Sequence, residues 1–148
     1  DIETIHAATD LVAEAKLSPE LRNEALYYRA KAYTKQKADK KAVDDLRELA
    51  KDTRNAYGAE AKYLVAQSLY DAKEYNAAEK ELLNYIEQST PHAYWLARSF
   101  VLLSDVYAAM GKELDARQYL LSLQQNYQGN DDIATMIESR LSKLKVKN

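Results

Sequence analysis

The sequence predicts an all-α chain in which helical hairpins stack as an α-solenoid. Three observations favour this class. Apolar residues recur at helical spacing, without the alternation of strands. Only 3 Gly and 2 Pro punctuate 148 residues, so long helices joined by few turns are expected. A set of small, aromatic and leucine positions also repeats along the chain, which is typical of stacked repeats.

The composition suits a globular chain and disfavours several functions. Hydrophobic residues make up 47% and charged residues 30% of the chain, enough for a core and a polar surface. The net charge of −2 disfavours a nucleic-acid partner, since such proteins usually carry a basic excess. There is no cysteine, which excludes disulfides, thiolate nucleophiles and cysteine-based zinc sites. No apolar run approaches the roughly 18 residues that span a bilayer, so we expect no direct membrane insertion.

The punctuation divides the chain into eight expected helices. Ser18 with Pro19, and Thr90 with Pro91, combine an N-cap residue with a proline suited to the first helical position. Gly129 is expected to end a helix in a left-handed conformation, before a new cap at Asn130 or Asp131. The expected ranges are 2–17, 19–35, 39–52, 56–72, 75–89, 91–110, 113–127 and 131–145. Their short connections predict antiparallel hairpins.

Three of these hairpins share one pattern. The small residues Ala30, Ala66 and Ser104 are 36 and 38 residues apart, and each is followed twelve positions later by an alanine. A small residue on each helix lets the two backbones approach closely, and larger side chains fill the space beside the contact. The equivalent positions are the alanines Ala42, Ala78 and Ala116, the tyrosines Tyr33, Tyr70 and Tyr107, and the leucines Leu46, Leu82 and Leu120.

The pattern resembles the tetratricopeptide repeat. The third hairpin carries it best, in Phe100, Leu103, Ser104, Tyr107, Gly111, Ala116 and Leu120; the second matches in Val65, Ala66, Tyr75, Ala78 and Leu82. The first hairpin departs from the family pattern, because Arg29 stands where Leu is expected. The resemblance covers nearly the whole chain. It implies a right-handed solenoid of three hairpins, with a leading half-repeat helix and a C-terminal capping helix.

The resemblance also implies a context. The capping helix would use an apolar face of Ile133, Met136, Ile137, Leu141 and Leu144. Because the chain starts on half a repeat, we expect residues 1–148 to be one domain from the C-terminal part of a longer array, with an apolar face exposed on the first helix. The longer repeats and tyrosine-rich first helices are similar to those of bacterial cell-envelope proteins, which favours the periplasm or envelope.

Catalysis is not indicated. Glu3 and His6 have the Glu-x-x-His spacing that di-iron bundles use twice, but Ser89 stands at the matching position before His92, so the second copy is missing. The three glycines are too scattered for a phosphate-binding loop. The sequence therefore predicts no enzyme, and neither a metal nor a cofactor.

The resemblance instead implies a protein or peptide partner on a concave face lined by the first helices. The projected positions are Glu24, Tyr27, Lys31 and Lys35, then Glu60, Tyr63, Gln67, Tyr70 and Asp71, then Arg98, Val101, Asp105 and Ala109. Among these, Tyr27, Lys31, Tyr63, Gln67, Tyr70, Arg98 and Asp105 form the predicted partner-binding set. Tyr63 and Tyr70, two turns apart, would anchor an extended or helical peptide; the other interpretation is that they are ordinary exposed residues.

A second function stays open on the sequence alone. The chain could be a structural spacer or a self-association scaffold, using its first or last helix as the contact and having no dedicated groove ligand.

Overall fold

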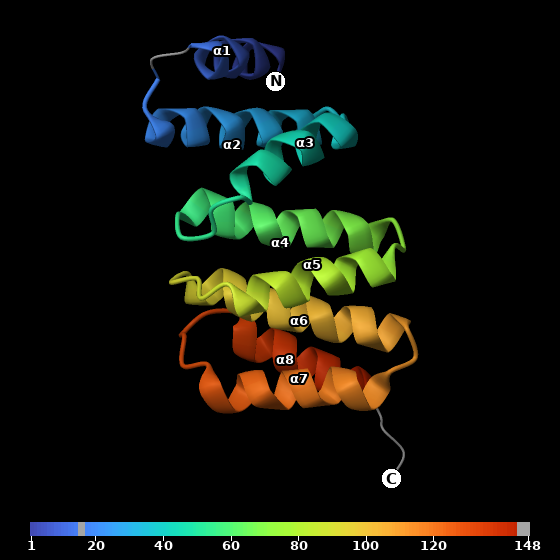
Figure 1. Cartoon of the computed structure of the whole chain (residues 1–148). Coiled ribbons are helices and arrows are strands. Elements are labelled where there is room, and N and C mark those ends of the chain that lie inside the picture. Colours follow the sequence, from blue (N-terminus) through green and yellow to red (C-terminus); the bar gives the residue numbers. More distant parts are fainter. Residues whose placement is uncertain (15–16, 145–148) are drawn as a thin grey trace. The chain divides into compact units, whose positions relative to one another are not determined.

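The computed structural model describes residues 1–14 and 17–144, and within them the chain is all-α, with eight helices and no strand (Figure 1). The helices are α1 (Ile2–Ala13), α2 (Pro19–Lys35), α3 (Asp39–Leu49), α4 (Ala56–Asp71), α5 (Tyr75–Glu87), α6 (Ala93–Ala109), α7 (Glu113–Asn126) and α8 (Ile133–Lys143). The chain divides into two compact units, residues 1–65 and 66–148, with the boundary inside α4. None of the described helices is both long enough and apolar enough to cross a membrane.

Most helix starts agree with the sequence prediction, and the differences have local causes. Ser18 accepts a hydrogen bond from the Leu21 amide at 3.2 Å, with Pro19 in the first position of α2. Thr90 instead accepts from the His92 amide at 3.2 Å, so α6 begins only at Ala93 and Pro91 lies before it. The expected first helix ran to 17, but α1 ends at Ala13 with an extended Glu14; residues 15–16, and the predicted end at 145, lie outside the described residues.

The end of α7 corrects one prediction. This helix ends at Asn126 and Tyr127 is extended, so Gly129 does not cap it. The start of α8 is closer to expectation, because the Asp131 carboxylate accepts from the Ile133 amide at 3.0 Å. An acidic residue two positions before the helix thus satisfies one of the amides that a helix N-terminus leaves open.

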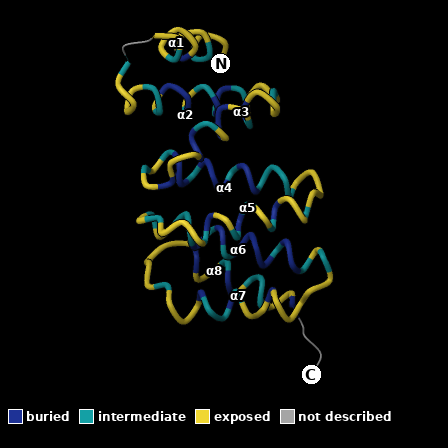
Figure 2. The backbone as a smooth tube through the Cα atoms, in the orientation of Figure 1, coloured by how far each residue is buried: buried dark blue, intermediate teal, exposed yellow. Residues whose placement is uncertain are grey.

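The three hairpin turns have the same backbone conformation. Lys37, Lys73 and Gly111 have φ values of 59°, 62° and 77°, and they are 36 and 38 residues apart, as the repeat predicts. In each turn the next residue donates its amide to the carbonyl five positions earlier, as in Ala38 to Tyr33, Glu74 to Leu69 and Lys112 to Tyr107. These are Schellman turns, in which one left-handed residue lets the chain reverse. The turns are exposed (yellow in Figure 2).

The repeated packing positions are buried, which confirms their interpretation as core. The buried positions are Ala30, Ala66 and Ser104, then Ala42, Ala78 and Ala116, then Leu46, Leu82 and Leu120. Tyr107 is also buried, whereas Tyr33 and Tyr70 are half-buried.

In the first unit, α1 packs on α2 and α2 packs on α3. The departure at Arg29 has a clear reason here. Its guanidinium forms two parallel hydrogen bonds with the Asp45 carboxylate on α3, at 2.7 and 2.6 Å, and a third to the Thr9 hydroxyl on α1 at 3.2 Å. Asp45 is only 5% exposed. A fork-shaped ion pair therefore joins α2 to α3, and the hydrogen bond to Thr9 adds α1.

In the second unit, α5 packs on α6, and α8 contacts both α6 and α7. The apolar face predicted for the last helix is used in this contact, since Ile133 and Ile137 are 0% and 2% exposed and Leu144 is also buried. Met136 and Leu141 are half-buried. On α1, by contrast, Ile2 is 60% exposed and Leu11 is 44% exposed, as the sequence led us to expect for this helix.

Candidate interaction surfaces

An aromatic and charged cluster lies in the first unit, and it contains two residues of the predicted set. It consists of Tyr27, Tyr28 and Lys31 of α2 with Tyr57 and Glu60 of α4; we call it the Tyr27 cluster. The Tyr27 ring lies 5.3 Å from that of Tyr28 and 4.7 Å from that of Tyr57, between ring centroids. The Tyr27 hydroxyl donates to Glu60 at 3.0 Å. The rings are thus held in place by contacts within the unit.

The Glu60 carboxylate is the charged acceptor that both Tyr27 and Lys31 contact. Lys31 Nζ lies 2.8 Å from its carboxylate and 5.1 Å from the Tyr27 ring centroid, within cation–π range. Burial, followed by the hydrogen bond to Glu60, raises the pKa of the Tyr27 hydroxyl. Burial lowers the pKa of Lys31, but the hydrogen bond and charge of Glu60 outweigh it, and the pKa is raised overall. Tyr27 is therefore neutral and Lys31 charged at neutral pH.

An open apolar groove between α1 and α2 borders the cluster. Its lining includes Ala8, Leu11, Leu21, Ala25 and Tyr28. Leu21 is 52% exposed and Tyr28 is 49% exposed, and Tyr28 belongs to both features. Polar anchors therefore lie next to exposed apolar area on one side of the first unit, a combination typical of surfaces that bind proteins.

Two of the projected groove positions do not face solvent. Tyr63 is 6% exposed and Val101 is 3% exposed, so the prediction that Tyr63 offers an open anchor is wrong. Tyr63 lies three positions before Ala66, which puts it on the face of α4 that holds the small packing residue. Tyr63 is thus a buried side chain of α4.

Gln67 and Tyr70, from the predicted set, belong to the second unit. Gln67 donates to Asp71 one turn later at 2.9 Å, and both side chains remain near the surface of α4. The Tyr70 ring lies 5.7 Å from the ring of Tyr75 and also lines a pocket against α6 and α8.

This pocket, which we call the α6–α8 pocket, unites Tyr70 with a second predicted residue, Asp105. The Asp105 carboxylate faces Arg140 of α8, with Nε and Nη2 at 3.3 and 3.4 Å from its two oxygens. Lys143, one turn further along α8, and Ser104 also line the pocket. Burial raises the pKa of Asp105, although its hydrogen bond and ion pair with Arg140 oppose the rise.

Arg98, the remaining predicted residue, is near the start of α6. Its guanidinium donates to the Tyr94 hydroxyl at 3.0 Å and lies 5.7 Å from the Trp95 ring centroid. The Tyr94 hydroxyl in turn donates to Asp132 at 2.9 Å. Arg98 thus belongs to a local network that joins α6 to the start of α8, and it is separate from the α6–α8 pocket.

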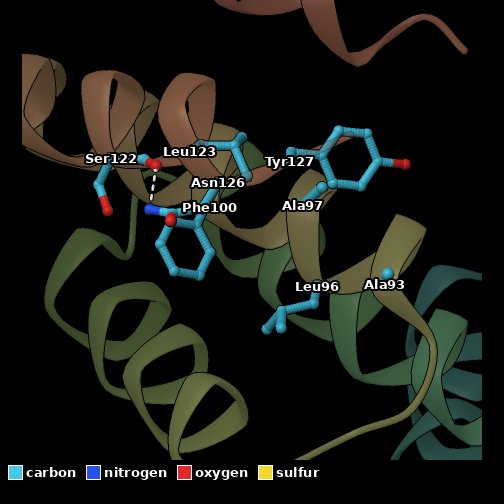
Figure 3. A pocket seen from close by; sticks show the side chains of 8 residues that line it. All are labelled: Ala93, Leu96, Ala97, Phe100, Ser122, Leu123, Asn126 and Tyr127. Atoms are coloured by element: carbon cyan, nitrogen blue, oxygen red, sulfur yellow. Dashed lines mark hydrogen bonds between the residues drawn. The ribbon is translucent and has the colours of Figure 1, made fainter. Parts of the chain in front are cut away.

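A second pocket of the same unit lies between α6 and α7 (Figure 3). Figure 3 shows Phe100 and Tyr127 at its two ends, with Leu96 between them. The Asn126 amide, the main polar group, donates to the Ser122 carbonyl at 2.7 Å. The Tyr127 hydroxyl donates to Asp131, and burial followed by this bond raises its pKa to about 12. No charged side chain lines this pocket within the part of the chain that is described.

The histidines and acidic residues do not gather. Within residues 1–14 and 17–144, no group of three or more His, Asp or Glu side chains is placed to hold a metal ion. His6 is exposed on α1, and His92 precedes α6 as its N-cap residue.

Sequence reasoning missed several residues of these surfaces. Tyr28 and Tyr57 complete the Tyr27 cluster, and Arg140 and Lys143 complete the α6–α8 pocket. An i, i+1 tyrosine pair at 27 and 28 was a usable signal for the first surface. The repeat pattern could not identify the α6–α8 pocket, because α8 lies outside the aligned hairpins. The sequence alone therefore does not predict which residues of α8 face α6.

Comparisons with known proteins add no relative: no family model, curated protein or solved structure matches this chain.

Proposed function

We propose that this chain is a protein-interaction module of the tetratricopeptide-repeat type, which binds a peptide or protein segment on the first-helix surface of its first unit. The observation that carries the proposal is the Tyr27 cluster beside the apolar groove of α1 and α2. Support for the repeat type comes from the three Schellman turns at the predicted spacing and from the burial of the repeated small residues.

The cluster suits a peptide because its polar groups are already oriented. Tyrosine offers a large contact area at low entropy cost, with a hydroxyl that hydrogen-bonds at the edge. The Lys31 side chain is 43% exposed and the Glu60 side chain 15% exposed, so the pair still reaches solvent. A peptide backbone would meet these polar groups, while its apolar side chains would enter the groove at Leu21 and Tyr28. Ordering the rings in advance lowers the entropy cost of binding.

A random-peptide display selection against the immobilised chain tests the proposal. We expect selected peptides to lose about tenfold or more in affinity for Tyr27→Ala, since a buried aromatic anchor typically contributes that much or more. Leu114→Ala is the control, because Leu114 is 72% exposed in the second unit. Peptides that bind the Tyr27→Ala and unaltered proteins equally would refute this surface.

The alternative, self-association through a terminal helix, is favoured by one observation. Ile2, Leu11 and Leu21 leave apolar area exposed on α1 and α2, whereas α8 buries its apolar face within the second unit. Self-association would therefore use α1 and not α8. Sedimentation equilibrium of the Ile2→Ser, Leu11→Ser double variant separates the two functions: a dimer that dissociates supports the scaffold, and a monomer in both proteins counts against it.

A further inference from the structure

The α6–α8 pocket holds a hydroxyl group that the packing of the repeat does not need. Ser104 is 1% exposed, and its Oγ has no hydrogen-bond partner among the residues that the structure describes. The equivalent residues of the other two hairpins are Ala30 and Ala66, which are buried to the same degree. Burying an unpaired hydroxyl destabilises the folded state, so an alanine would serve the packing better. Because Ser104 lines the pocket, a bound acceptor would satisfy its hydroxyl.

The guanidinium in this pocket is only loosely paired. Arg140 approaches Asp105 at 3.3 and 3.4 Å, whereas Arg29 approaches Asp45 at 2.7 and 2.6 Å. Charge-assisted hydrogen bonds are usually about 2.7–2.9 Å long, so the Arg140 pair is long and the Arg29 pair is optimal. An arginine has five N–H donors, and Asp105 engages two of them. Arg140 therefore keeps donor capacity for a second acceptor in the pocket.

Charge and size define the class of ligand. Arg140 and Lys143 bring two positive charges to the lining and Asp105 one negative charge, which leaves one positive charge to balance. A monoanion meets this balance, while a dianion would exceed it. The cavity of about 250 Å³ is smaller than the roughly 300 Å³ at which drug-sized sites begin. Leu144 adds an apolar wall that suits a short hydrocarbon chain.

We propose that the α6–α8 pocket is a binding site for a small aliphatic carboxylate. Its carboxylate would accept from Arg140, Lys143 and the Ser104 hydroxyl, with its chain against Leu144. The Tyr70 hydroxyl, neutral because burial and the charge of Asp105 raise its pKa, would be a further donor at the mouth. The site does not rest on the proposed peptide surface, which belongs to the other unit.

Titration of the isotopically labelled chain with sodium butyrate, followed by NMR at constant ionic strength, tests the site. We expect saturable shifts of the Ser104 amide and the Arg140 Nε–H signals. Ser104→Ala and Lys143→Gln should each weaken butyrate binding about tenfold, the usual effect of losing a hydrogen bond to a charged group. Inorganic phosphate should bind more weakly than butyrate, and chloride should give no saturable shift.

Two of the variants also control for folding and for charge. Ser104→Ala reproduces the residue of the other two hairpins and should fold, with an unfolding midpoint at or above that of the unaltered protein. Lys80→Gln, at an exposed lysine of α5, is the matched control for charge and should bind butyrate normally. Shifts that do not saturate, equal affinity in Ser104→Ala and Lys143→Gln, or phosphate binding as tight as butyrate would each overturn the carboxylate site.

Discussion

Residues at equivalent positions of the three hairpins are not always equally exposed. Tyr27, Tyr63 and Val101 are equivalent positions by the repeat spacing, yet only Tyr27 is half-exposed. The spacing predicts that these residues share a helix face; it does not predict how much of each face the neighbouring helices cover. The burial of Tyr63 was therefore beyond the sequence, whereas the buried alanines followed directly from their small size and their recurrence.

Gly58 is predicted to be the least replaceable glycine. A Cβ at this position would clash with the Asp52 carbonyl oxygen and would lie 2.7 Å from that of Leu49, both backbone atoms that cannot move aside cheaply. We expect Gly58→Ala to lower the free energy of unfolding by about 3 kcal/mol, at the upper end for overpacking. Urea denaturation followed by circular dichroism measures this, and a loss below about 1 kcal/mol would show that the turn between α3 and α4 readily relaxes.

Substitutions at the left-handed residues of two hairpin turns should have small effects of opposite sign on stability. A Cβ at Gly111 would meet nothing within 4 Å, so Gly111→Ala should cost only the strain of its left-handed backbone, about 1 kcal/mol. Lys73→Gly relieves the same strain at the equivalent turn but adds freedom to the unfolded chain, so a gain of roughly 0.5 kcal/mol is expected. Thermal unfolding of both variants checks the signs; two shifts of the same sign would contradict the equivalence of the turns.

Asp105 predicts a distinctive pH dependence. Burial, opposed by Arg140, raises its pKa above the ordinary value of 3.8. The folded state then holds this proton more tightly than the unfolded state, so the contribution of Asp105 to stability falls as pH rises from the unfolded to the folded pKa. The free energy of unfolding of the unaltered protein, minus that of Asp105→Asn, should decrease as the pH rises above 3.8. A difference that increases with pH would mean that Arg140 outweighs burial.

At the scale of elements, the sequence predicted the number, type and starts of the helices well, because caps and apolar periodicity are local properties. It did not predict the pairing of Arg29 with Asp45, since each residue alone has the form of a surface charge. The hairpins differ in residue type here: the first has the ion pair of Arg29 and Asp45, and the third has Leu103 and Tyr119 at the equivalent positions.

The ion pair predicts that substitutions at Arg29 of α2 and Asp45 of α3 have strongly coupled effects on stability. Arg29→Leu alone leaves the Asp45 carboxylate buried without its partner and should cost about 3 kcal/mol of stability. Adding Asp45→Tyr gives both positions the residue types of the third hairpin, Leu and Tyr. It should recover most of this loss, because well-packed apolar residues often replace buried ion pairs at little cost. Denaturant melts of the two singles and the double form the test. Additive losses would contradict a direct coupling.

For the whole molecule, the two units carry different surfaces. The first combines the Tyr27 cluster with the exposed apolar area of α1 and α2. The second has the α6–α8 pocket, to which α8 and its C-cap contribute Arg140, Lys143 and Leu144. Two distinct surfaces on helical hairpins are consistent with the proposed binding function, because such a function depends on the residues at the surface and not on the fold itself.

The most direct measurement of the central claim is NMR mapping of a display-selected peptide on the labelled chain. The proposal predicts that shifts concentrate in residues 24–31 of α2 and 57–61 of α4, and that Tyr27→Ala abolishes them while Leu114→Ala leaves them unchanged. Shifts confined to the second unit, or unaffected by Tyr27→Ala, would contradict the assignment of the partner-binding surface to the Tyr27 cluster.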